Sequence, residues 1–349
     1  MSTTTTTTTQ TIADDVRDFI ADYVSLPSES YLDLLALFVL HTHAFKAART
    51  TPYIYVTSQG PGSGKTRVME VMSEICRKST MQAGLTGPTL FTMIEARKPT
   101  LFMDEVDTIY SGAKNEELRG VLNSGYKHNG SVARIDRSSE DGFRDYSTFC
   151  PKVLAGIDNG QVPDTVLDRS IRIVLQKAAP GQVKPFYSED VEDDAADLMD
   201  SIDAWVTANM EELSNRENRP AALDGLSDRQ NDIIRPLLTI ADRIPGWGKR
   251  ARIAATTAFG EQETPLTPAT RALANVRDWF TQNPDADRVS SATVMELTGQ
   301  NGKQIGAWFS QFGIKGGTYM FDGKNSKGYK IEVLSPAFDR FLPTTTPRA

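Results

Sequence analysis

Residues 59–66, with the sequence Gln-Gly-Pro-Gly-Ser-Gly-Lys-Thr, constrain the fold of this chain more than any other stretch. They follow the apolar run 53–56 and lead into residues 66–78, which are predicted to form a helix. Glycines between a strand and a helix let backbone N–H groups turn around an anion, and the helix directs its positive end toward that anion. This order predicts a phosphate-binding loop, although Gln59 stands where the strict pattern has a glycine.

The residues of this loop have defined expected roles in binding ATP. We expect Lys65 to contact the β- and γ-phosphates, and the hydroxyl of Thr66 to bind Mg²⁺. The other expected nucleotide contacts are Gly60, Gly62, Ser63, Gly64 and Arg67.

A second motif, residues 100–105 (Thr-Leu-Phe-Met-Asp-Glu), is an apolar run that ends in two acids. A buried strand that ends in this way, in the same domain as a phosphate-binding loop, is a Walker B arrangement. We expect Asp104 to bind Mg²⁺ and Glu105 to polarise the water that attacks the γ-phosphate. The two motifs together predict an ATP hydrolase that uses Mg²⁺.

The composition narrows the class of protein. Its 39% hydrophobic and 24% charged residues are ordinary for a globular chain, and 349 residues allow two or three domains. No apolar run has the length of a membrane span, and the threonine-rich start lacks the features of a signal peptide, so we expect a protein of the bacterial host cytosol. Two cysteines and three histidines exclude a zinc finger or a disulfide framework. His41 and His43 do not share a helix face, and we expect one to be packed and the other solvated.

The net charge of −7 argues against a protein coated for nucleic acid, but the charge is uneven. From residue 265 onward there are ten Lys or Arg against seven Asp or Glu. A mildly basic C-terminal module on an acidic remainder is compatible with DNA contact.

Several further segments suggest contacts with DNA or with the γ-phosphate. Residues 131–137 alternate as a strand does and lie between Asn-Gly and Asp-Gly, which predicts a β-hairpin. Its basic candidates for phosphate contact are Lys127, His128, Arg134 and Arg137, and the alternative is a merely solvated hairpin. Asp158 or Asn159, after the apolar strand 152–157, could sense the γ-phosphate or simply form a turn.

Two arginines are candidates for contact with the phosphates of ATP. Arg169, at a helix-to-strand junction, could protrude as a finger toward a neighbouring subunit, or pair with Asp164 or Asp168 within its own. Arg229 starts a helix in a region that we expect to be an α-helical lid. It could reach the γ-phosphate from above or form a capping ion pair.

The end of the chain predicts a separate module. After a Pro/Thr-rich linker, three helices (268–281, 290–297 and 302–312) precede a hairpin formed by 318–321 and 328–333, which together are typical of a winged helix. Lys303 and Gln304 would start its recognition helix, and Lys324, Lys327 and Lys330 would lie on the wing. Such modules bind DNA or protein.

The order of these motifs resembles the AAA+ ATPases. Residues 39–42, 115–120, 154–157, 167–171 and 226–229 are similar, more narrowly, to an uncharacterised family of phage and actinobacterial P-loop ATPases often found beside primase domains. The resemblance implies an α/β fold: a P-loop ATPase core of parallel sheet flanked by helices, with an α-helical lid and a C-terminal winged helix. The expected parts are a disordered tail (1–10), N-terminal helices and core (11–180), lid (181–260), linker (261–268) and winged helix (269–343).

The resemblance also implies a function. We expect a homo-oligomeric ring, a hexamer, that acts as a replicative helicase of a phage or prophage on single-stranded or forked DNA, with a possible replication protein as partner. The alternative is an ATP-switched helicase loader or regulator that binds a protein through its winged helix. A metabolic kinase is a third reading, in which the C-terminal module has no role.

Overall fold

The computed structural model describes residues 10–58, 60, 62–81, 87–110, 116–157, 162–261, 268–321 and 323–342. The chain divides into two compact units, Met1–Glu263 and Thr264–Ala349, and each is described by itself. The expected tail over residues 1–10 lies outside the described residues except for Gln10, as does most of the expected linker.

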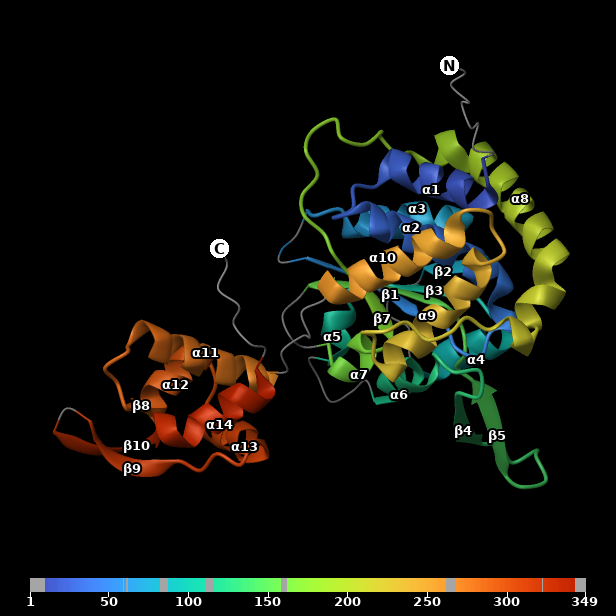
Figure 1. The fold of residues 1–349 in the computed structure, drawn as a ribbon. Helices are drawn as coiled ribbons and strands as arrows, with labels where there is room; N and C mark the ends of the chain where they lie inside the picture. The colour runs from blue at the N-terminus through green and yellow to red at the C-terminus, as the bar shows by residue number, and fades with distance from the viewer. Residues whose placement is uncertain are drawn as a thin grey trace, which may run out of the picture. The chain divides into compact units, whose positions relative to one another are not determined.

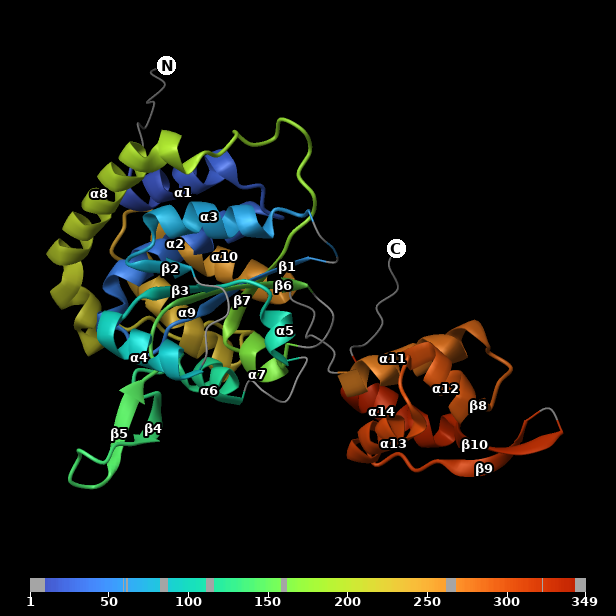
Figure 2. The same ribbon diagram turned by 180° about the vertical axis from the view of Figure 1, so that it is seen from behind.

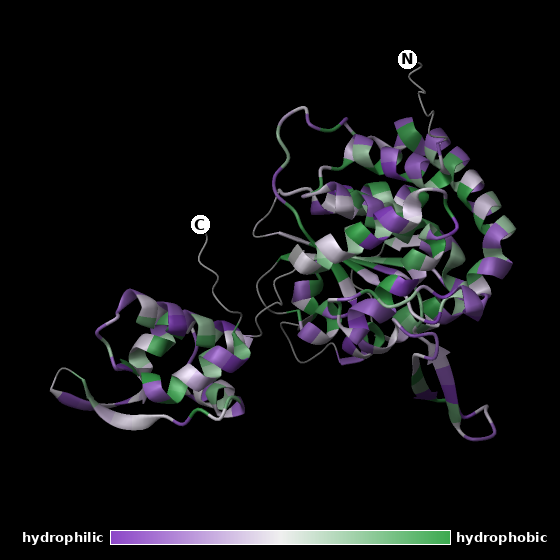
Figure 3. Ribbon diagram, in the orientation of Figure 1, coloured by the Kyte–Doolittle hydropathy of each residue, from purple (hydrophilic) through white to green (hydrophobic). Residues whose placement is uncertain are grey.

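The first unit is built on a five-stranded sheet in the order β2-β3-β6-β1-β7, with every pair parallel. The strands are β1 (Tyr53–Ser58), β2 (Ser79–Met81), β3 (Thr100–Met103), β6 (Lys152–Ile157) and β7 (Ser170–Val174). β1 and β3 are buried at every position because both faces of a parallel sheet are covered by helices. This is why they appear in the sequence as continuous apolar runs, and Figure 3 shows hydrophobic colouring along the central strands.

Helices cover the sheet on both sides (Figures 1 and 2). On one side lie α1 (Ile12–Tyr23), α2 (Glu29–Ala44) and α3 (Lys65–Ile75). On the other lie α4 (Gly87–Arg97), α5 (Val106–Tyr110), α6 (Glu116–Ser124) and α7 (Asp164–Leu167). No helix within the described residues is long and apolar enough to cross a membrane.

The second helix, α2, is central to the core. It is buried along nearly its whole length and packs against α1 and two later helices, α9 (Asp228–Ala241) and α10 (Trp247–Glu261). Its Asp33 accepts hydrogen bonds from Arg17 Nε at 3.1 Å and Arg250 Nε at 2.6 Å, which offset the cost of burying a carboxylate. His41 and His43 are both buried, so the expectation that one of them is solvated is wrong. His43 Nδ1 lies 2.6 Å from Asp203 Oδ1.

Three helices follow the sheet: α8 (Ser188–Ser214), α9 (Asp228–Ala241) and α10 (Trp247–Glu261). Their apolar residues, among them Ile233 and Trp247, belong to the same hydrophobic core as α2 and the sheet. α9 and α10 contact α2, and α8 contacts α3. All three helices therefore belong to the first unit, and their role as a lid stays a prediction.

A two-stranded hairpin, β4 (Ser131–Ile135) and β5 (Phe143–Ser147), confirms the predicted hairpin and projects from this unit (Figures 1 and 2). At its base, the backbone N–H of Ser147 donates to Glu95 Oε2 at 2.8 Å. At its far end, Ile135 pairs across the strands with Phe143, and their side chains are 78% and 58% exposed.

The second unit has its own core, which includes Leu273, Val276, Phe309 and Leu334. Its elements in order are α11 (Pro268–Gln282), β8 (Arg288–Ser290), α12 (Ser291–Thr298), α13 (Gly302–Gln311), β9 (Gly317–Phe321), β10 (Lys324–Lys330) and α14 (Ile331–Phe341). The strands form an antiparallel sheet in the order β8-β10-β9. Residues 331–333, which the sequence suggested as the end of a strand, instead begin α14, and β8 was not predicted.

Candidate nucleotide site

The topology of the sheet brings the two sequence motifs to one edge. β6 lies between β1 and β3, with Ser58 in register with Ile157 and Met103 with Leu154. The glycine-rich loop leaves the carboxyl end of β1, and Asp104 and Glu105 leave the carboxyl end of β3. The two motifs therefore flank the end of β6, at the edge where parallel sheets bind ligands.

The loop places backbone donors at the start of α3. Gly64 precedes the helix with a φ of 92°, and Gly62 has a φ of 73°, backbone conformations that side chains other than glycine rarely adopt. No side chain caps the first turn of α3, so its N–H groups are left for another acceptor. A β-carbon at Gly60, Gly62 or Gly64 would meet no atom within 4 Å, so the space around the loop is open. This geometry suits a bound phosphate.

Lys65 is held at the same loop by neutral acceptors. Its Nζ donates to Ser58 Oγ at 2.7 Å and to the carbonyl of Gly60 at 3.3 Å. Its positive charge has no carboxylate partner among the described residues and is available to an anion. Ser58, the last residue of β1, was not predicted as a site residue, although its position directly before the loop was the available signal.

The acidic pair lies at a strained strand-to-helix turn. Glu105 has a φ of 52°, which is unusual for a residue with a side chain and costs of the order of 1 kcal/mol. Its backbone N–H donates to Asp104 Oδ1 at 2.8 Å, and its carbonyl accepts from the N–H of Thr108 at 2.9 Å. Both acids are exposed, so their carboxylates can meet a ligand. Backbone strain of this kind is concentrated at functional sites.

Asp107 ties this turn to the end of β6 and was not predicted. Its Oδ1 accepts the backbone N–H of Ile157 at 3.2 Å, and a β-carbon at Gly156 would lie 2.8 Å from the same oxygen. A glycine at 156 thus allows β6 to approach α5 closely. Asp107 positions the turn that carries Asp104 and Glu105.

Some predicted residues lie outside the described residues or are engaged elsewhere. Gln59, Asp158 and Asn159 are outside the described residues, so the roles of Asp158 and Asn159 as sensors stay predictions. Arg67 Nε pairs with Glu70 Oε2 at 3.0 Å, and its guanidinium lies 5.2 Å from the centre of the Phe186 ring. Arg67 is therefore held along α3 rather than in the loop.

Arg169 and Arg229 meet at the opposite edge of the sheet. The guanidinium carbons of Arg169 and Arg229 lie 4.7 Å and 5.0 Å from the centre of the Tyr126 ring, and Arg229 Nη1 donates to the Tyr126 hydroxyl. The carbonyls of Arg169 and Tyr126 accept the N–H groups of Tyr53 and Thr51, at the amino end of β1.

This placement bears on both arginines. The six residues of β1 separate that amino end from the loop by about 17 Å, at ~3.3 Å per residue. In this structure Arg229 is held at the Tyr126 ring, so its contact with the γ-phosphate stays a prediction. The backbone of Arg169 lies beside the amino end of β1, so Arg169 would act on a site of another subunit. The buried ring of Tyr126 that holds both arginines was not predicted, because no local pattern marks it.

The residues proposed for DNA contact fall in two places. In the first unit, Lys127, His128 and Arg137 are exposed, whereas Arg134 Nη2 pairs with Glu117 Oε1 at 2.6 Å and its guanidinium stacks on Phe91. Arg134 is therefore already occupied within the chain. In the second unit four further candidates are exposed: Lys303, Gln304, Lys324 and Lys327.

The described residues fit a magnesium ion that is shared with a nucleotide. Mg²⁺ usually takes one or two protein carboxylates and completes its shell with phosphate oxygens and water. Thr66 is exposed on the first turn of α3, and Asp104 keeps one carboxylate oxygen that no hydrogen bond in the described structure uses. Thr66 and Asp104 are therefore the two residues that would hold such an ion. No cluster of three or more His, Cys, Asp or Glu side chains occurs among the described residues.

Comparison with known proteins assigns neither a family nor an activity to this chain. Residues 174–341 match a family described as a protein of unknown function, DUF3631, and this match excludes both motifs of the site. No curated protein matches the chain. Among solved structures, the apo C-terminal region of NrS-1 is 11% identical, with a TM-score of 0.42 over 91% of this chain and 75% of that one.

The RuvB Holliday junction branch migration motor of Thermotoga maritima is also 11% identical, with a TM-score of 0.27 over 94% of this chain and 100% of that one. A point mutant of the same RuvB gives a TM-score of 0.30 at 12% identity, over 90% of this chain and 95% of that one. Likenesses at this level transfer no activity to this chain.

Proposed function

We propose that this protein hydrolyses ATP between the subunits of a ring and uses the reaction to move on DNA, as a replicative helicase does. The observation that carries the proposal is the juxtaposition of the Lys65 loop and the Asp104–Glu105 turn on either side of β6. A cationic, N–H-lined loop binds a triphosphate, and an exposed carboxylate beside it can polarise a water.

Each residue of the site then has a role. The N–H groups at the start of α3 and the amine of Lys65 hold the β- and γ-phosphates. Thr66 and Asp104 would hold Mg²⁺, which neutralises charge on those phosphates when bound. Glu105 accepts a proton from the attacking water, and the hydrogen bond from its own N–H to Asp104 fixes the turn.

The position of Arg169 supports assembly into a ring. Because it lies at the edge of the sheet opposite to its own loop, it can stabilise a transferring phosphoryl group only in a neighbouring subunit. In such an assembly, one edge of each subunit contacts the opposite edge of the next subunit. A head-to-tail contact of this kind forms a ring when its rotation closes. Hydrolysis then depends on assembly.

Two surfaces support contact with DNA. The hairpin presents Ile135 and Phe143, exposed apolar side chains of the kind on which bases stack, together with Arg137 in the turn between the strands. The second unit has the element order of a winged helix, with Lys303 and Gln304 at the start of α13 and Lys324 and Lys327 on the strand of its wing.

The experiment that tests this function measures ATP hydrolysis with and without single-stranded DNA, together with the unwinding of a forked duplex. A motor shows hydrolysis stimulated by single-stranded DNA and separates the fork only when ATP can be hydrolysed. Slow hydrolysis that DNA does not change, with no unwinding, would refute the motor and favour an ATP-switched loader that binds a protein partner. Native mass measurement with a non-hydrolysable ATP analogue determines the size of the ring.

A further inference from the structure

A pocket at the amino edge of the sheet lies outside the proposed nucleotide site. Three segments wall it: the end of α2 with the chain that follows, the end of α8 with the short helix η3 (Arg216–Asn218), and one face of α9. Its volume is about 360 Å³, within the range of small-molecule sites. Because α2 ends before the amino end of β1, the length of that strand separates this pocket from the Lys65 loop.

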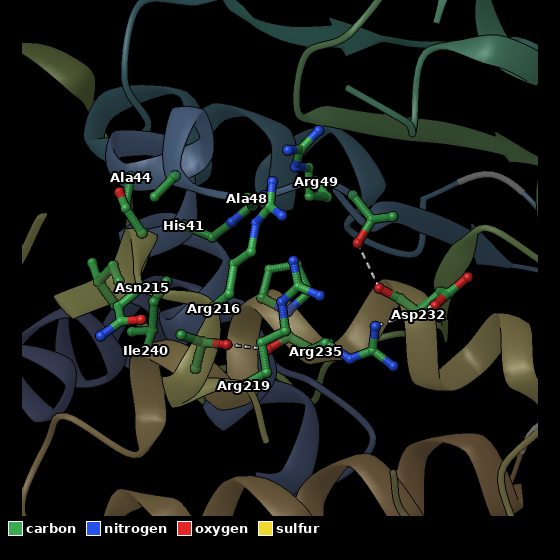
Figure 4. Close-up of a pocket in the computed structure, with 16 residues that line it drawn as sticks. His41, Ala44, Ala48, Arg49, Asn215, Arg216, Arg219, Asp232, Arg235 and Ile240 are labelled. Atoms are coloured by element: carbon green, nitrogen blue, oxygen red, sulfur yellow. Dashed lines mark hydrogen bonds and ion pairs between the residues drawn. The ribbon is translucent and has the colours of Figure 1, made fainter. Parts of the chain in front are cut away.

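The lining of the pocket is strongly positive. Four arginines line it, against a single carboxylate, that of Asp232; the arginines are Arg49, Arg216, Arg219 and Arg235. Figure 4 shows these side chains around the pocket. Thr50 Oγ1 donates a hydrogen bond to the carbonyl of Asp232 at 2.6 Å. This excess of cations is unexpected by chance in a chain whose net charge is −7. It selects an anionic ligand.

Most of this charge is uncompensated. Arg235 lies 3.5 Å from the carboxylate of Asp232, whereas Arg49, Arg216 and Arg219 form no ion pair within the described residues. His41, at the floor of the pocket, adds no charge because burial lowers its pKa to about 3, and its Nε2 is engaged by Thr51 Oγ1 at 2.8 Å. Three guanidinium groups thus have N–H donors available, in the planar arrangement that matches phosphate oxygens.

The rest of the wall is mixed. Its polar residues are Thr50, Ser214, Asn215 and Thr239, and its aliphatic residues are Ala44, Ala47, Ala48, Leu213, Pro236 and Ile240. The small aliphatic side chains can accept a flat ring, and the guanidinium groups next to them can bind phosphates. A pocket of this volume suits a compact ligand, whereas a nucleic acid strand is normally followed along a groove.

We propose that this pocket is a second anion site, which binds a small phosphate-bearing molecule of the nucleotide class independently of the Lys65 loop. Arg216 in η3 and Arg219 directly after it hold its phosphate groups, Arg49 holds them from the chain that follows α2, and the aliphatic part of the wall contacts its base. Arg49 lies two residues before Thr51, whose N–H donates to the carbonyl of Tyr126, so the segment that lines the pocket is hydrogen-bonded to the residue whose ring contacts Arg169.

The experiment uses the full chain carrying Lys65→Ala, so that the loop no longer binds nucleotide. Binding of fluorescent ADP is measured by anisotropy, with inorganic pyrophosphate, adenosine and a short oligothymidylate as competitors. We expect weak, salt-sensitive ADP binding that pyrophosphate displaces and adenosine does not. Adding Arg216→Ala should weaken it about tenfold or more, the loss of a charge-assisted bidentate contact.

Two further variants control the result. Arg97→Ala, which removes an exposed arginine at the end of α4, should leave ADP binding unchanged. Arg216→Lys keeps the charge but not the planar fork, so it should bind with intermediate affinity, and thermal melting verifies that each variant is folded. The proposal is overturned if the Lys65→Ala chain binds no ADP, if Arg216→Ala and Arg97→Ala bind alike, or if only the oligonucleotide competes. A separate outcome tests the proposed nucleotide site: if ATP does not bind at the Lys65 loop, the Lys65→Ala chain will bind ATP as tightly as the wild type.

Discussion

Replacing Arg169 with alanine, and then mixing that variant with one that lacks Lys65, tests whether the active site is shared between subunits. Arg169 lies at the amino end of β1 and the Lys65 loop at its carboxyl end, about 17 Å away at ~3.3 Å per residue. If Arg169 takes part in hydrolysis, it therefore does so in a neighbouring subunit. Alone, Arg169→Ala should lower the hydrolysis rate by about 10³-fold or more, the usual contribution of such an arginine.

The mixture gives a quantitative expectation. Neither variant alone forms a complete site, because one lacks the arginine and the other the lysine. In randomly mixed rings, about a quarter of the contacts join an intact loop to an intact arginine, so about a quarter of the wild-type rate should return. The assay is steady-state phosphate release at a fixed total protein concentration, after the subunits have exchanged.

Protein stability is the control for this prediction. Arg169→Ala also removes a contact with the Tyr126 ring, worth about 1 kcal/mol, which should lower the Tm by only about 2–4 °C. Nucleotide affinity should stay close to that of the wild type. The shared site is refuted if Arg169→Ala hydrolyses ATP normally, or if the mixture is no more active than its two components.

Three further predictions concern stability and DNA binding. Asp33→Ala should lower the free energy of unfolding by about 3 kcal/mol, because it leaves two guanidinium groups without their buried partner. Asp242→Ala removes a more exposed ion pair and should lower it by about 1 kcal/mol or less. Equal losses for the two variants in urea unfolding would contradict this. Exchanging Ile135 and Phe143 for serine should weaken the binding of single-stranded DNA, measured by anisotropy, by about tenfold and leave the Tm unchanged. Unchanged DNA affinity would show that the hairpin is not part of the DNA site. Burial lowers the pKa of Lys152, so the folded chain loses this proton at a lower pH than the unfolded chain. The stability of the wild type relative to Lys152→Met should therefore rise with pH, up to the ordinary lysine pKa of 10.5. A difference in stability that does not depend on pH would refute this prediction.

The sheet and its two motifs could be predicted because their physics is local. Buried parallel strands are continuous apolar runs, and a glycine-rich loop ends one of them while two acids end another. The sequence therefore located Lys65, Asp104 and Glu105. By contrast β2 and β8, with three residues each, are too short to show any period.

Long-range packing accounts for most of what the sequence did not predict. α2 is apolar on all sides, which indicates a helix buried in a core, but its partners α9 and α10 lie about 200 residues further along the chain. Arg229 meets Tyr126, 103 residues away in the sequence, and no local pattern reveals such a contact. Residues 331–333 alternate apolar and polar side chains over a stretch too short to distinguish a strand from the first turn of a helix.

The central claim is that ATP binds at the Lys65 loop and that Glu105 activates the attacking water. Single-turnover hydrolysis of radiolabelled ATP with Mg²⁺, measured beside ATP affinity for Glu105→Gln and Lys65→Ala, tests it most directly. We predict that Glu105→Gln binds ATP as tightly as the wild type but hydrolyses it about 10²–10⁴-fold more slowly, whereas Lys65→Ala loses tight binding. Wild-type turnover by Glu105→Gln, or undiminished ATP affinity in Lys65→Ala, would contradict the account.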